Sequence, residues 1–286
     1  FAFIKATEGD DFNDPRYRQN FRDGTQAGLK MAPYHFARPT DSSARDQADH
    51  FMDMIGIADS DDEANLPTEA ETTERPRSVS HMPAWARRWQ RLLFDNGWLL
   101  PGQPPEFGGR NATVLQQFVH LEELCNRRIY HSFNPQGVNI VAASLISFGS
   151  EEQKHRWAVP VLKGETTASL GMSEPSAGSD LASLRTRAVL DGDHFVVNGQ
   201  KVWTSGAHDA DFLLTFVRTD PDAPKHKGIG YFLVDMNTPG IRIRPLRTAS
   251  GDAHFNEVFF DDVFVPDAML VGEPTAGWSH ALSTMA

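Results

Sequence analysis

The chain has 286 residues, of which 40% are hydrophobic and 23% are charged, a composition typical of globular proteins with one large or two modest domains. Its formal net charge of −11 argues against general binding to nucleic acid or to anionic membranes. No apolar run approaches the ~20 residues that a membrane helix needs, and no secretion signal is visible at the start. The single cysteine, Cys125, lies in a helical pattern where a buried thiol is expected, and it favours a reducing, cytoplasmic setting.

Residues 1–56 alternate strand-like and helix-like segments. Apolar runs predict strands at 1–4 and 31–36. Helical spacing of apolar residues predicts helices at 21–29 and 42–55. This βαβα order implies that the two strands are parallel.

Residues 57–83 are first acidic and then rich in Thr, Glu, Arg and Pro, which predicts a linker that buries little apolar surface.

Residues 84–165 predict helices. Apolar stripes run from Trp85 to Leu93 and from Val114 to Arg127, and residues 138–148 are apolar nearly all round, as in a central helix.

A capping box marks the start of the next helix. Ser150 and Gln153 have the spacing at which each side chain can hydrogen-bond the other residue's backbone N–H. We therefore expect a helix to begin here and to continue toward Leu162.

Residues 166–275 predict an antiparallel β-barrel or sandwich. The pairs Asp191-Gly192 and Asn198-Gly199 tolerate positive φ and are strong hairpin signals. They are expected to join strands at 185–190, 194–197 and 201–205, followed by strands at 212–217, 230–234, 241–244 and 257–260. The expected fold class is multidomain α+β, with an α-helical domain before an antiparallel β-barrel and a short βαβα piece at the N-terminus.

Two polar segments predict a ligand site. Residues 171–180 read Gly-Met-Ser-Glu-Pro-Ser-Ala-Gly-Ser-Asp, and residues 201–205 read Lys-Val-Trp-Thr-Ser. Small residues let backbone N–H groups approach a ligand, hydroxyls can hydrogen-bond its edge, and an indole can cover an aromatic ring. This combination suits a flat aromatic cofactor with polar edges.

Residues from about 64 to 286 resemble the N-terminal helical and middle β-barrel domains of the acyl-CoA dehydrogenase family. Besides the two polar segments, the resemblance rests on Gly97-Trp98, on residues 104–109, on Glu122-Glu123, and on residues 149–154 and 259–266, in the family's order. A second helical domain follows the barrel in that family, and we expect residues 276–286 to be its start. The resemblance places the catalytic glutamate on that domain, so we expect none of these residues to be the base, and the chain to be incomplete and inactive by itself.

The resemblance implies FAD as cofactor and an acyl-CoA thioester as substrate. The implied cofactor contacts are Met172 and Ser173 at the pyrimidine edge, Gly178 and Ser179 near the pyrophosphate, Trp203 with Thr204 at the ring, and Ser205 near N5. Ser179 is also placed near the acyl-CoA thioester. The implied reaction is α,β-dehydrogenation with hydride transfer to FAD, as in fatty-acid oxidation. A homo-oligomer is typical of the family, and no metal is expected.

Residues 1–55 resemble a different family, the glycoside hydrolase family 25 lysozymes. The match lies at residues 3–9, 14–15, 20, 27–29, 34–36 and 47–51. It places Glu8 in the cleft wall and gives His35 a lining role, although a semi-buried structural histidine is an equal alternative. Glycoside hydrolysis needs two carboxylates, and this segment supplies neither member of the family's pair.

Three hypotheses therefore stand. The favoured one is a flavin-dependent oxidoreductase of the acyl-CoA dehydrogenase type. The alternatives are a peptidoglycan-cleaving, lysozyme-like fragment and a non-catalytic chimeric remnant whose exposed barrel face mediates association.

Overall fold

The computed structural model describes residues 2–8, 12–13, 31–36, 71, 74, 76–126 and 133–285. The chain divides into two compact units, one formed by residues 1–68 and 92–131 and the other by residues 69–91 and 132–286. The helices expected at 21–29 and 42–55 lie outside the described residues, as does most of the expected linker.

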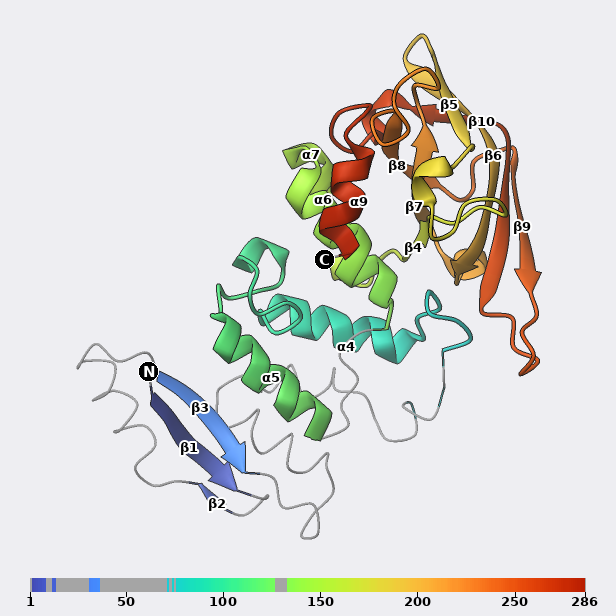
Figure 1. Cartoon of the computed structure of the whole chain (residues 1–286). Coiled ribbons are helices and arrows are strands. Elements are labelled where there is room, and N and C mark those ends of the chain that lie inside the picture. The colour runs from blue at the N-terminus through green and yellow to red at the C-terminus, as the bar shows by residue number, and fades with distance from the viewer. Residues whose placement is uncertain are drawn as a thin grey trace. The chain divides into compact units, whose positions relative to one another are not determined.

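Three strands at the N-terminus form a small sheet (Figure 1). They are β1 (Ala2–Glu8), β2 (Phe12–Asn13) and β3 (Met31–Phe36). β3 runs parallel to β1, as the βαβα order predicts, while β2 pairs antiparallel with β1.

The first helices among the described residues are α4 (Ala84–Asp95) and α5 (Val114–Asn126), with the short 3-10 turn η2 (Pro105–Phe107) between them. Both helices lie where their apolar stripes predict them. The expectation of a buried thiol is wrong, because Cys125 is exposed. The α5 side chains of Leu115, Phe118 and Leu121 are also exposed.

Between residues 137 and 162, the helices of the second unit follow one another with little interruption. They are η3 (Gly137–Ala142), α6 (Ala143–Phe148), α7 (Glu151–Gln153), η4 (Lys154–Ala158) and α8 (Val159–Leu162), and η3 and η4 are π-helical. The predicted capping box is present: Gln153 N donates to Ser150 Oγ at 3.2 Å, and Ser150 N donates to Gln153 Oε1 at 3.0 Å.

A curled sheet follows these helices in the same unit (Figure 1). Its strands are β4 (Ala168–Gly171), β5 (Arg187–Asp191), β6 (His194–Ser205), β7 (Phe212–Arg218), β8 (Ile229–Asp235), β9 (Ile241–Leu246) and β10 (Phe255–Pro266). Their order is β4-β7-β5-β6-β10-β9, with β8 paired to β7. The sheet is mixed, because β7 pairs in parallel with β4 and, at one position, with β5.

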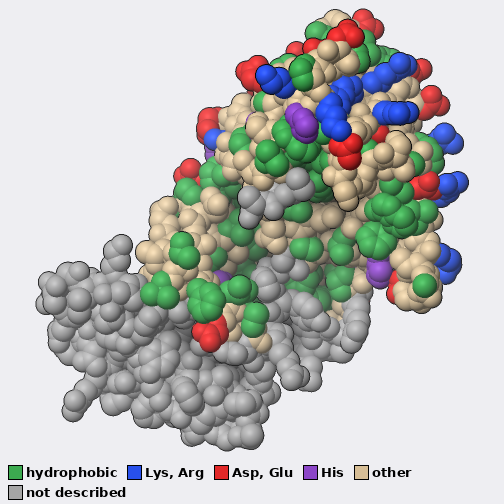
Figure 2. All heavy atoms as spheres, viewed as in Figure 1, with side chains coloured by type: hydrophobic (Ala, Val, Ile, Leu, Met, Phe, Trp, Pro, Cys, Tyr) green, Lys and Arg blue, Asp and Glu red, His purple; other side chains and the backbone are tan. Residues whose placement is uncertain are grey.

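Helices followed by this sheet confirm the α+β class. The short turns of the sheet region are η5 (Leu181–Ser183), η6 (Ala207–Asp209) and η7 (Asp267–Met269), and α9 (Gly277–Met285) comes last. Figure 2 shows Lys, Arg, Asp and Glu side chains interspersed over the sheet region in that view, rather than gathered into one basic face.

One of the two predicted hairpins does not form. β5 and β6 do form a hairpin, with Asp191 opposite His194 and Gly192 at φ +65°. At Asn198-Gly199, however, the chain does not turn, and β6 continues as one strand from His194 to Ser205. A Cβ on Gly199 would lie only 2.6 Å from the Thr186 Cα, so this glycine permits close strand approach instead of a turn.

Candidate cofactor site

A β-bulge at the end of β6 decides where Trp203 points. Lys201 pairs with Val258 and Thr204 pairs with Asn256, so three steps along β6 match two steps along β10. Trp203 lies at the bulge, and its backbone adopts the left-handed conformation, at φ +61°. Strict alternation would put Trp203 on the inner face with Val197 and Lys201. The bulge instead turns Thr204 inward and leaves Trp203 60% exposed.

The first polar segment forms a tight turn after β4. Glu174 and Ala177 exchange two backbone hydrogen bonds of 2.8 and 3.1 Å. Met172 and Ser173 precede this turn and are half-buried, while Gly178 and Ser179 follow it and are exposed. A Cβ on Gly178 would meet nothing within 4 Å, so the backbone there is open to an approaching group.

A buried ion pair joins the two segments. Lys201 is 0% exposed, and its Nζ donates to Glu174 Oε1 at 2.9 Å and to the Met172 carbonyl at 3.1 Å. Beside it, Val202 N donates to the Ser173 carbonyl at 2.9 Å. The segments that the sequence predicts to share one site are therefore in direct contact.

Glu174 is saturated with donors. Besides Lys201, its carboxylate accepts the backbone N–H of Arg185 at 2.6 Å and that of Thr186 at 2.9 Å. Burial lowers the pKa of the Lys201 ammonium to about 8, although Glu174 opposes this shift. Burial alone would raise the pKa of Glu174, but the charge of Lys201 and these hydrogen bonds together hold it below its ordinary value.

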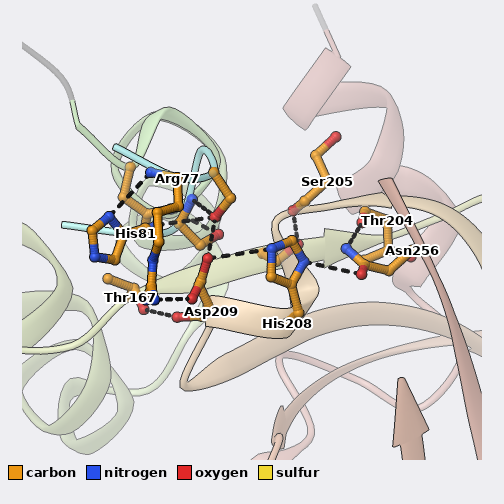
Figure 3. Close-up of polar contacts among 12 residues, drawn as sticks. Arg77, His81, Thr167, Thr204, Ser205, His208, Asp209 and Asn256 are labelled. Atoms are coloured by element: carbon orange, nitrogen blue, oxygen red, sulfur yellow. Dashed lines mark hydrogen bonds and ion pairs between the residues drawn. The ribbon is translucent and has the colours of Figure 1, made fainter. Parts of the chain in front are cut away.

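The two hydroxyls at the bulge differ in their exposure. Thr204 Oγ1 is buried and has no hydrogen-bond partner among the described residues. Ser205 is half-buried, and its carbonyl accepts the Ser169 hydroxyl at 2.7 Å (Figure 3). Together with the exposed indole, the Ser205 hydroxyl fits a flat ring with a polar edge, whereas the Thr204 hydroxyl faces the interior.

The structure thus brings together Met172, Ser173, Trp203, Thr204 and Ser205, with Gly178 and Ser179 four to five residues past Glu174 on the same loop.

Glu8 and His35 lie at the ends of paired parallel strands, where Glu8 is in register with Phe36 and His35 with Thr7. In the part of the chain that the structure describes, no cluster of three or more His, Cys, Asp or Glu residues could hold a metal ion. No described helix is both long and apolar enough to cross a membrane.

Sequence reasoning assigned no role to Lys201, although a signal was available. Lys201 falls in phase with Phe195 and Val197, which the strand alternation places on the inner face. A lysine on a buried face needs a partner anion, and Glu174 is a candidate within the other polar segment. His208 and Asn256, which contact each other behind the bulge, gave no comparable signal because 48 residues separate them.

Comparison with known proteins identifies the family of this region. The family model "Acyl-CoA dehydrogenase, N-terminal domain" matches residues 63–165, and "Acyl-CoA dehydrogenase, middle domain" matches residues 169–263. The model "Glycosyl hydrolases family 25" matches residues 1–96 and so overlaps the first of these.

Curated relatives agree with the dehydrogenase match. Acyl-CoA dehydrogenase FadE34 of Mycobacterium tuberculosis is 48% identical over 197 residues, which are 69% of this chain and 27% of that protein. Acyl-CoA dehydrogenase FadE29 of the same organism is 42% identical over 215 residues, which are 75% of this chain and 54% of that protein. The chain spans about half the length of most of these relatives, and less of FadE34.

Solved structures show the same fold. The structure titled "Tcur3481-Tcur3483 steroid ACAD" has a TM-score of 0.65 and 36% identity, covering 76% of this chain and 56% of that one. The ChsE4-ChsE5 complex from Mycobacterium tuberculosis has a TM-score of 0.62 and 32% identity, covering 80% of this chain and 55% of that one. Over residues 63–263, the chain belongs to the acyl-CoA dehydrogenase family, as its N-terminal and middle domains.

Proposed function

We propose that the bulge and the turn joined to it bind FAD, and that the protein takes part in the α,β-dehydrogenation of an acyl-CoA thioester. The observation that carries the proposal is the exposed indole of Trp203, whose backbone has a positive φ and directly follows Lys201 and Val202, the residues that bond the Met172 and Ser173 carbonyls. A left-handed conformation costs a tryptophan about 1–2 kcal/mol, and such strain is typical of functional sites.

The chain's own residues would bind and orient the cofactor. Trp203 would cover one face of the ring, and the Ser205 hydroxyl and the backbone at Met172 and Ser173 would meet its polar edges. The open backbone at Gly178 and Ser179 would approach the pyrophosphate and the thioester. When bound, FAD supplies the two-electron acceptor chemistry that no amino-acid side chain provides.

Retention of flavin tests this proposal. The chain is mixed with FAD and desalted, and the visible absorbance of bound flavin is measured for the wild type, Trp203→Leu and Phe264→Leu. Phe264 is a matched control, because it is an aromatic residue of the same sheet with 55% exposure against 60% for Trp203. We expect the wild type and Phe264→Leu to retain flavin and Trp203→Leu to lose most of it. A wild-type chain without flavin, or equal retention by all three, would contradict the proposal.

The match of residues 1–96 to glycosyl hydrolase family 25 makes peptidoglycan cleavage a second candidate. The parallel pairing of β1 and β3, which places Glu8 and His35 near the same strand ends, favours it. Clearing of peptidoglycan by the wild type but not by Glu8→Gln would support this activity, and no clearing by the wild type would exclude it.

A further inference from the structure

A chain of polar contacts lies directly behind the bulge (Figure 3). Asn256 on β10 is 0% exposed, and its Nδ2 donates to the Thr204 carbonyl at 2.9 Å. Its Oδ1 lies 3.0 Å from His208 Nδ1. Because the amide nitrogen already faces a carbonyl, the amide oxygen must accept, and the network assigns the proton to His208 Nδ1.

The other side of His208 is anchored to the N-terminal part of the same unit. His208 Nε2 lies 3.3 Å from Asp209 Oδ2. The Asp209 carboxylate in turn accepts Ser78 Oγ at 2.8 Å and an Arg77 guanidinium N–H at 3.1 Å. His208 therefore lies between a fixed carboxylate and the buried amide of Asn256.

Pairing with β10 and side chains from other elements together hold the backbone at this end of β6. The ladder resumes after the bulge, with Thr204 opposite Asn256 and Ser205 opposite Phe255, and the Thr204 and Ser205 carbonyls also accept from the Asn256 amide and the Ser169 hydroxyl. The strand ends at Gly206, whose N–H donates to the His254 carbonyl at 2.8 Å. The positions of Trp203 and Ser205 thus depend on side-chain contacts from outside β6 in addition to the pairing with β10.

We propose that His208 and Asn256 are positioning residues for the cofactor site: they fix the Thr204 carbonyl, and through it the placement of the Trp203 indole and the Ser205 hydroxyl. This inference rests on the proposed function and deepens it. Neither residue needs to touch the cofactor, and Asn256 is too deeply buried to do so.

Graded variants of His208 test the inference. In His208→Asn, the side-chain amide can place an N–H donor near the position of Nδ1, whereas His208→Ala has no donor. His194→Ala is the matched control, because the His194 side chain is also 29% exposed and also lies beside carboxylates, at the opposite end of β6. One net hydrogen bond corresponds to about a tenfold change in affinity. We expect FAD binding to be about tenfold weaker in His208→Ala, and within about threefold of wild type in His208→Asn and His194→Ala.

Hydrogen exchange gives a second measurement that needs no flavin. The Val202 and Gly206 amides are hydrogen-bonded on either side of the bulge, and we expect both to exchange about tenfold faster in His208→Ala than in His194→Ala. Wild-type chain that binds no FAD would refute the proposed function and leave the exchange result to decide the positioning role. Unchanged exchange in His208→Ala, or equal FAD affinity in His208→Ala and wild type, would overturn the inference.

Discussion

The substitution Glu174→Gln tests whether the buried ion pair joins the two halves of the candidate site. Two contributions to the loss of folding stability can be estimated from the structure. Without Glu174, Lys201 must release its proton when folded, and the step from a pKa of about 8 to pH 7 costs about 1.4 kcal/mol. Glutamine also has a single acceptor oxygen for the donors of Lys201, Arg185 and Thr186, and an unsatisfied buried donor costs about 1–3 kcal/mol. We therefore expect a loss of about 2.5–4.5 kcal/mol, which overlaps the usual cost of breaking a buried pair.

Urea unfolding at pH 7, followed by tryptophan fluorescence, measures this loss. The control is Glu151→Gln, since Glu151 pairs with Lys154 at the surface with 77% exposure. An exposed pair contributes little, so the control should lie within about 0.5 kcal/mol of wild type. The double variant Glu174→Gln/Lys201→Met should be less destabilised than the sum of its single variants. Additive losses would refute the reasoning, as would a Glu174→Gln variant as stable as its control.

The remaining predictions concern single positions in the sheet region. The free energy of unfolding of the wild type, relative to that of Lys201→Met, should rise by up to about 3 kcal/mol from pH 8 to 10.5. The reason is that the unfolded lysine still binds a proton that the folded lysine, with a pKa of about 8, has lost. Equal dependence of the two stabilities on pH would contradict this prediction. Gly206→Ala should lower the free energy of unfolding, measured with urea, by about 2–3 kcal/mol or more, because the φ of Gly206 is +67° and a Cβ would lie 2.6 Å from Ser80 Oγ. Gly192→Ala should lower it by only about 1 kcal/mol, because Gly192 has a similar φ of +65° but lies in open space. Thr204→Val should be neutral or stabilising by up to about 1 kcal/mol, since the buried Oγ1 has no partner among the described residues; a loss above about 1 kcal/mol would reveal a hydrogen bond there.

Local patterns predicted the helices after residue 84 and most strand positions in the part of the chain that the structure describes. The capping box at Ser150 works because both of its hydrogen bonds are made within four residues, and the βαβα order was sufficient to predict parallel pairing of β1 with β3. The two Xaa-Gly hairpin signals show the limit of such reasoning. Gly192 turns the chain, but Gly199 lies in a continuous strand because Thr186 packs against its Cα, a contact that no short-range pattern reveals.

The composition of the candidate site was predictable, but its geometry was not. Residues 171–180 and 201–205 indicated a ligand by residue type, and the structure confirms that these segments are in contact. The exposure of Trp203 depends on a bulge that strict alternation would exclude. The exposure of Cys125 depends likewise on how α5 packs, which its own helical pattern does not specify.

The buried pair also explains how the site keeps its register. A slip of β6 by one residue would move Lys201 off the inner face and place Val202 or Gln200 opposite Glu174. Glu174 would then lose its cation while remaining buried with two backbone donors, at a cost of several kcal/mol. An apolar pair at the same positions would tolerate the slip far better, because apolar contacts have no direction. A lysine that carries a burial penalty is therefore consistent with selection for one alignment of β6 against the turn after β4, the alignment in which Val202, next to Trp203, donates to the Ser173 carbonyl.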